Sequence, residues 1–187
     1  MMKKELIKIY EYFSHNFRTC TSTIVATLEA LKMDLINVND EEMNSVYESA
    51  YIMDILDISL NICIDHLIQN DVKNTDYELN VTNLIKKFLD EQKSFILLNE
   101  VEININGEDF VIHKNGYILK YLLQLIIFEA IKNSSDLLNI KVSDQKVDIQ
   151  INNPKDHPPV IFNLLSDILN KYGFNFTFNE KEYILGF

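Results

Sequence analysis

Residues 12–22, YFSHNFRTCTS, hold one of the four histidines of this 187-residue chain. If the segment is helical, Arg18 and Thr19 follow His15 by three and four residues and share its face. An exposed imidazole is largely neutral near pH 7, so it can attack phosphorus as a nucleophile. Arg18 would then position a phosphoryl group, and Thr19 would hydrogen-bond the phosphate or a water molecule. These residues could form a phosphoacceptor site, although most exposed helical histidines are only solvated side chains.

The segment belongs to an expected long helix over residues 4–38. Its apolar residues recur at steps of three and four, at Leu6, Tyr10, Phe13, Phe17, Cys20, Ile24, Leu28, Leu31, Leu35 and Val38. This spacing places them on one helical face. His15 is two positions from Phe13 and from Phe17, so it should project away from that face.

A second helix with the same spacing is expected over residues 43–67. It should follow a capping box formed by Asn39 and Glu42. The two helices would form an antiparallel hairpin, which cannot cover both of its own apolar stripes. We therefore expect a homodimer in which two hairpins make a four-helix bundle.

A polar linker over residues 69–76 divides the expected domains, 1–70 and 76–187. The second domain should have helices over 84–95, 116–133 and 161–172. We expect an Asn106-Gly107 hairpin between strands 101–105 and 110–112. NIKVSD and KVDIQIN should form another strand pair, and FNFTF and EYILGF a third. The predicted fold class is α+β, with helices on a mostly antiparallel sheet.

Composition excludes several classes of function. The net charge of −11 disfavours nucleic-acid binding, which depends on Lys and Arg contacts to phosphates. The longest apolar run, YLLQLIIFEAI, is too short to span a bilayer and contains Gln and Glu. The N-terminus has no secretory-signal pattern, and the two cysteines fit a reducing cytosol. We expect a cytoplasmic protein that binds neither nucleic acid nor membranes.

The order of elements resembles the core of sensor histidine kinases. SHNFRT is similar to the phosphoacceptor box of that family, Ser-His-Glu-Leu-Arg-Thr-Pro. DYELNVTNLIKKFLDEQ resembles the first helix of its ATP-binding domain, and VEININGEDFVIHKNGYILKYLLQLIIFEAIKNS resembles the hairpin and helix of its asparagine box. KVDIQINNPKD is similar to the strand before its first glycine box. The resemblance implies a phosphoacceptor hairpin carrying His15, followed by an ATPase-like α/β sandwich.

The nucleotide site that this resemblance implies is degenerate. Leu125 and Glu129 stand where the family has the two asparagines of its asparagine box. We expect Glu129 to face solvent rather than to bind a metal. Asn152 replaces the adenine-binding aspartate, both glycines of that motif are missing, and little room remains for a glycine-rich lid. We therefore expect no bound cofactor and no ATP binding.

The acceptor box also departs from the family. Asn16 replaces the acidic residue that acts as a base, and an amide cannot take a proton from imidazole, which disfavours autophosphorylation. Cys20 replaces the usual proline, so the helix should continue without a bend. Phosphate exchange with a receiver-domain aspartate does not need the missing base, since the receiver supplies Mg²⁺ and most of the electrostatics. These departures match histidine phosphotransferases derived from kinase cores.

Three functions remain open. The leading hypothesis is a phosphorelay protein that passes phosphoryl groups between His15 and receiver-domain aspartates, without ATP-dependent autokinase activity. The second is a response-regulator phosphatase in which Asn16 and Thr19 orient water. The third is a non-catalytic, pseudokinase-like scaffold that binds a receiver domain.

The remaining histidines and cysteines have simpler interpretations. We expect His66 to be partly buried and structural, near the level of His15 in the hairpin. His113 and His157 receive no role because no metal-ligand spacing surrounds them. Cys20 and Cys63 fall on apolar faces and should be small core residues.

Overall fold

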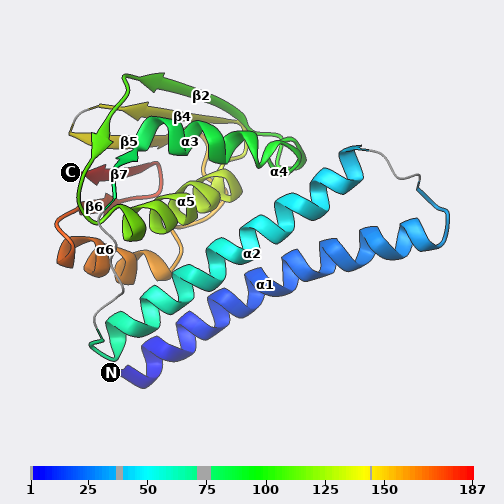
Figure 1. The fold of residues 1–187 in the computed structure, drawn as a ribbon, viewed down its shortest axis with the longest axis horizontal. Helices are drawn as coiled ribbons and strands as arrows, with labels where there is room; N and C mark the ends of the chain where they lie inside the picture. The colour runs from blue at the N-terminus through cyan, green and yellow to red at the C-terminus, as the bar shows by residue number, and fades with distance from the viewer. Residues whose placement is uncertain (1, 37–39, 71–76, 144) are drawn as a thin grey trace.

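The computed structural model describes residues 2–36, 40–70, 77–143 and 145–187 (Figure 1). Two long helices form an antiparallel pair, and an α/β region follows them. The elements are α1 (Met2–Lys32), α2 (Asp40–Leu67), β1 (Leu79–Asn80), α3 (Val81–Asp90), α4 (Lys93–Leu98), β2 (Glu102–Gly107), β3 (Val111–Ile112), α5 (Gly116–Asn133), β4 (Leu137–Val142), β5 (Lys146–Ile151), α6 (Ile161–Lys171), β6 (Asn175–Phe178) and β7 (Glu182–Gly186).

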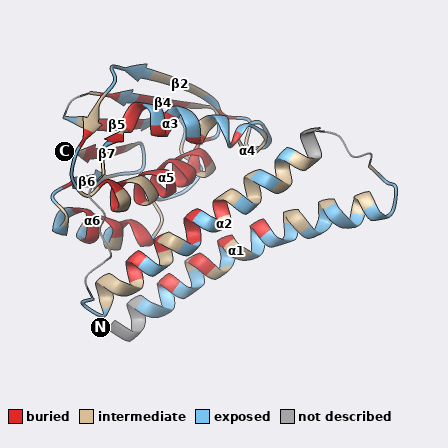
Figure 2. Cartoon of the chain, viewed as in Figure 1, coloured by how far each residue is buried: buried red, intermediate tan, exposed pale blue. Residues whose placement is uncertain are grey.

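The sheet agrees with most of the sequence prediction. Its strand order is β2-β4-β5-β7-β6, and among the described strands only the β2–β4 pair is parallel. The expected antiparallel pairs, β4 with β5 and β6 with β7, are both present. Helices α5 and α6 lie between this sheet and the helical hairpin (Figure 1). Helix α5 is buried along most of its length, because it contacts the sheet on one side and α2 on the other (Figure 2).

Helix α1 departs from the prediction in its buried stripe and in its length. The buried stripe passes through Ile9, Phe13, Asn16 and Cys20, so polar Asn16 takes the place expected for Phe17. The helix ends at Lys32, well before residue 38. Asp34 follows in the left-handed conformation at φ 55°, which short polar side chains tolerate and which closes a helix C-terminus. The predicted capping box includes Asn39, which lies outside the described residues.

The predicted hairpin between residues 101–105 and 110–112 is wrong. Strand β2 pairs in parallel with β4, whereas β3 pairs antiparallel with β1. Gly107 does not serve a tight turn; its φ is +145°, and an added Cβ would lie 2.2 Å from the carbonyl oxygen of Val142. The glycine is therefore required by its close approach to β4.

The predicted helix over 84–95 is two helices, α3 and α4. The break falls at Glu91 and Gln92, and Gln92 is fully buried. The Glu48 carboxylate of α2 accepts hydrogen bonds from the backbone N–H groups of Ser94 and Phe95, both at 2.9 Å. This carboxylate caps the N-terminus of α4, so a tertiary contact determines where the second helix begins.

The hairpin and the sheet region share one hydrophobic core, but only the proximal half of the hairpin contributes to it. The distal half projects beyond the sheet region (Figure 1). Several large apolar side chains there are exposed: Val25 (45%), Leu28 (49%), Met33 (66%), Leu35 (72%) and Tyr47 (66%). An apolar surface of this kind is typical of an interaction site.

We expect Gly107→Ala to lower the free energy of unfolding by about 2–4 kcal/mol, from overlap with Val142 combined with backbone strain. Gly173→Ala is the matched control, because Gly173 also has a positive φ (+87°) but has no neighbour within 4 Å of an added Cβ. Urea unfolding followed by circular dichroism measures both changes. Equal losses in the two variants would show that the contact with β4 does not constrain Gly107.

Candidate functional site

His15 lies on the exposed face of α1, as its spacing predicted. Arg18 and Thr19 are exposed beside it, whereas the intervening Asn16 is buried. The Thr19 hydroxyl donates a hydrogen bond to the His15 carbonyl oxygen at 3.1 Å. The hydroxyl proton of Thr19 therefore takes part in a hydrogen bond within the helix. The lone pairs of its oxygen remain available at the surface as hydrogen-bond acceptors.

The Asn16 side chain points inward, with only 4% of its surface exposed. Its Nδ2 donates to the Tyr12 carbonyl oxygen at 2.9 Å, and its Oδ1 accepts from Lys132 Nζ at 2.9 Å. Both polar ends of the amide are thus engaged, the Nδ2 within α1 and the Oδ1 across the interface with α5. A role in orienting water for a phosphatase would need this amide at the surface.

Glu129 is buried, which corrects the expectation that it faces solvent. Its Oε1 accepts hydrogen bonds from the Tyr12 hydroxyl at 2.7 Å and from Lys132 Nζ at 2.9 Å. We call Tyr12, Asn16, Glu129 and Lys132 the α1–α5 network. Burial and the adjacent Glu129 carboxylate together raise the pKa of Tyr12 well above its usual value of 10. The sequence analysis assigned no role to Tyr12 or Lys132.

Two hollows flank the α1–α5 network. One, of about 450 Å³, lies toward the N-terminal part of α1 and the 156–160 segment; the other, of about 480 Å³, lies between the hairpin and α4. His15, Asn16 and Lys132 line both hollows, and Thr19 lines the second. Arg18 lines neither of them. Arg18 and Lys132 therefore have different surroundings.

The positions implied for nucleotide binding are occupied by internal contacts. Leu125 is fully buried. Asn133, at the end of α5, accepts from the Asp156 N–H through its Oδ1 at 2.7 Å and donates to the Tyr183 hydroxyl at 3.1 Å. The side-chain amide of Asn152 donates to Asp136. The segment that follows β5 is thus hydrogen-bonded to the end of α5 and to the start of β4.

His66 is partly buried, as expected, but it does not lie at the level of His15. It lines a hollow with Lys8 and Ile9, about two helical turns before His15. Burial and the nearby Lys171 lower its pKa. Its surroundings are those of a residue at the contact of α2 with α6.

The two cysteines are buried and unpaired, as predicted for small core residues. Burial raises the pKa of Cys63 to about 12, so this thiol stays protonated. The described residues include no cluster of three or more His, Cys, Asp or Glu side chains able to hold a metal ion. Among these same residues, no helix has the length and apolar character needed to cross a membrane.

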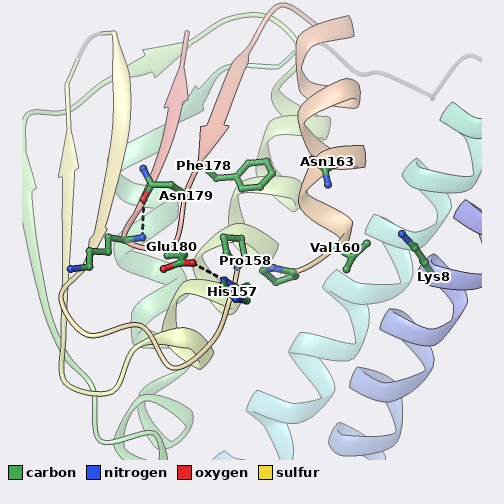
Figure 3. A pocket seen from close by; sticks show the side chains of 10 residues that line it. Lys8, His157, Pro158, Val160, Asn163, Phe178, Asn179 and Glu180 are labelled. Carbon is green, nitrogen blue, oxygen red and sulfur yellow. Dashed lines mark hydrogen bonds and ion pairs between the residues drawn. The ribbon is translucent and has the colours of Figure 1, made fainter.

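A further hollow lies at the surface near His157 (Figure 3). Its volume is about 770 Å³, and its lining includes Pro158, Phe178 and Lys8. His157 Nδ1 pairs with Glu180 Oε1 at 2.7 Å, with both side chains largely exposed. An ion pair so open to water contributes little, and the hollow contains none of the predicted site residues.

Comparison with solved structures identifies the fold. The Acinetobacter baumannii histidine kinase AdeS superimposes with a TM-score of 0.58 at 12% identity, over 92% of this chain and 96% of that one. The cytoplasmic segment of histidine kinase QseC gives 0.55 at 12% identity, over 82% and 98%. Histidine kinase ThkA, in complex with response regulator protein TrrA, gives 0.52 at 15% identity, over 100% and 63%.

The chain therefore has a histidine kinase-like core: a helical hairpin followed by an ATPase-like α/β sandwich. This confirms the fold class and the resemblance predicted from the sequence. No protein-family profile matches the chain, and no curated protein sequence is significantly similar to it. At identities of 12–15%, the likeness concerns the fold.

The raised pKa of Tyr12 predicts how stability depends on alkaline pH. Because the unfolded phenol ionises near pH 10 and the folded one at higher pH, the stabilisation is complete below pH 10 and is lost as pH rises above it. Between pH 10 and 11, the free energy of unfolding should fall less steeply with pH in Tyr12→Phe than in the wild type. The difference in slope should correspond to about one proton, or ~1.4 kcal/mol per pH unit. Tyr10→Phe, which removes an exposed tyrosine of the same helix, is the matched control. An unchanged slope in Tyr12→Phe would contradict the prediction.

Proposed function

We propose that this chain is a histidine phosphotransfer protein of a two-component phosphorelay. His15 receives a phosphoryl group from the aspartyl phosphate of one receiver domain and transfers it to the aspartate of another. The supporting observation is an exposed histidine on the hairpin of a histidine kinase-like fold in which Leu125 and Glu129, at the positions of the family's asparagine box, are buried. The complex of ThkA with a response regulator protein supports a receiver domain as the kind of partner.

The proposed reaction needs only an imidazole and the groups of the receiver. The neutral His15 ring attacks phosphorus through one nitrogen while the P–O bond to the receiver carboxylate breaks. The carboxylate leaves as an anion, and the other ring nitrogen loses its proton to water when the ring returns to neutrality. The receiver supplies Mg²⁺, and the exposed Arg18 can pair with the phosphoryl group or with acidic groups of the partner.

We propose that the chain has no ATP-dependent autokinase activity and binds no cofactor. Asn16 has no group able to accept the imidazole proton, and its amide is already hydrogen-bonded on both sides. The Leu125 side chain has no polar atom to offer a nucleotide or a metal. The segment after β5 has no glycines with which to bring backbone N–H groups to phosphates, and its N–H groups at 155 and 156 bond to Asn133.

We further propose that two copies associate through the distal half of the hairpin. The exposed Val25, Leu28, Met33, Leu35 and Tyr47 have no apolar cover within the described part of the chain. Packing two hairpins into a four-helix bundle would remove these side chains from water.

The central prediction concerns His15. Purified receiver domains of the source organism, phosphorylated with a labelled small phosphodonor, should transfer label to the wild-type chain and none to His15→Ala. His113→Ala is the matched control, because it removes another exposed histidine and should be labelled like the wild type. The label should be acid-labile and base-stable, as expected for phosphohistidine. Labelled ATP with Mg²⁺ should give no phosphohistidine.

The alternative functions predict different results in the same assay. Loss of phosphate from the receiver without label on the chain, retained in His15→Ala, would indicate a phosphatase. Binding of a receiver with neither label nor dephosphorylation would indicate a scaffold. Label from ATP would contradict the proposed loss of autokinase activity.

The second prediction concerns oligomeric state. Light scattering should give twice the 21.9 kDa mass of the monomer for the wild type. Leu28→Glu should shift the mass to the monomer, because it places a charge within the proposed interface. Leu98→Glu, at an exposed leucine of α4 outside the hairpin, should stay dimeric. A monomeric wild type would exclude the proposed bundle.

A further inference from the structure

We infer that Lys132 binds the phosphoryl group carried by His15. The inference rests on the proposed function, in which His15 is phosphorylated. It assigns Lys132 as the side chain of this chain that stabilises the phosphorylated His15. Lys132 belongs to α5 of the ATPase-like region, whereas His15 belongs to the hairpin. The two parts of the fold would therefore jointly form the phosphoacceptor site.

The Lys132 ammonium is fixed in place but not fully enclosed. Its Nζ donates to Asn16 Oδ1 and to Glu129 Oε1, each at 2.9 Å. The Lys132 side chain is 33% exposed, whereas that of Glu129 is 5% exposed. An ammonium group has three N–H donors, and the contacts with described residues use two of them. One donor is left to point toward an incoming anion.

Asn16 of α1 sets the position of the Lys132 ammonium relative to His15. Asn16, which holds Lys132, directly follows His15 in the sequence. His15 and Lys132 line both of the hollows that flank the network, whereas Arg18 lines neither. A phosphoryl group on His15 that points into either hollow would therefore share it with Lys132. Arg18 remains on the outer side, where a receiver domain would approach.

The electrostatics favour this use of Lys132. The Glu129 carboxylate balances the lysine charge before phosphorylation, so Lys132 is not left as a partly buried, unpaired cation. The Nζ lies 5.2 Å from the centre of the Phe128 ring, which limits its access to water. A phosphoryl group at His15 brings about two negative charges to this partly dry site, where a charge-assisted hydrogen bond is strong.

The test uses phosphoramidate as a phosphodonor, which removes receiver docking from the measurement. His15 attacks phosphorus, the P–N bond of phosphoramidate breaks, and ammonia leaves. Lys132→Met combined with Glu129→Gln removes the ammonium without leaving a buried carboxylate unpaired. Lys132→Arg keeps the charge. Lys120→Met is the matched control, because Lys120 also lies on α5 and also sits over an aromatic ring, that of Tyr121 at 4.8 Å.

We expect the double variant to form phosphohistidine about 10- to 100-fold more slowly than the wild type, the usual range for losing one charge-assisted hydrogen bond. Lys132→Arg should recover most of the rate, and Lys120→Met should match the wild type. The ³¹P chemical shift of phosphorylated His15 should change in the double variant, since it reports on groups that contact the phosphate. Circular dichroism verifies that each variant is folded.

Two results would overturn the inference. One is a wild-type rate together with an unchanged ³¹P shift in the folded double variant. The other is a slow rate in Lys132→Arg equal to that of the double variant, which would assign Lys132 a packing role. Both leave the proposed function intact if receiver domains still label the wild type. Conversely, labelling by phosphoramidate that depends on Lys132, without labelling by any receiver, would support the inference and reject the relay function.

Discussion

The buried carboxylate of Glu129 constrains the interface between α1 and α5. A carboxylate removed from water must be paired and hydrogen-bonded, and Tyr12 and Lys132 satisfy this requirement at 2.7 and 2.9 Å. Lys132 in turn holds Asn16, which fixes the rotation of α1 about its own axis. Because successive helical residues are about 100° apart, turning Asn16 inward places His15 outward. The exposure of the proposed nucleophile thus depends on a charge buried behind it.

The same contacts show what the positions implied for nucleotide binding do within this ATPase-like fold. Leu125 and Glu129 stand where the kinase resemblance places asparagines, and both now contribute to internal packing. Asn133 bonds to Asp156 and Tyr183, so the segment after β5 closes against the end of α5. Glu129 thus helps to attach the sheet region to the hairpin, and Asn133 connects three segments of the sheet region.

The sequence predicted the features that depend on local pattern. Alternation identified the strand pairs β4–β5 and β6–β7, and helical spacing placed His15, Arg18 and Thr19 at the surface. The predictions that failed depend on contacts between residues far apart in the sequence. Asn106-Gly107 has a strong turn signal, yet the glycine is required by Val142, 35 residues later. The start of α4 depends on Glu48, and the burial of Glu129 depends on Tyr12, 117 residues away. A local sequence pattern contains no information about these contacts.

The Glu48 carboxylate has a consequence for motion. It joins α2 to α4, while the α1–α5 network joins the other helix of the hairpin to the centre of the sheet region. Together with the shared hydrophobic core, these two separated attachments oppose rotation of one part about the other. A partner that binds across both parts therefore encounters a preformed surface. Binding to a preformed surface costs less conformational entropy than binding that must first order the two parts.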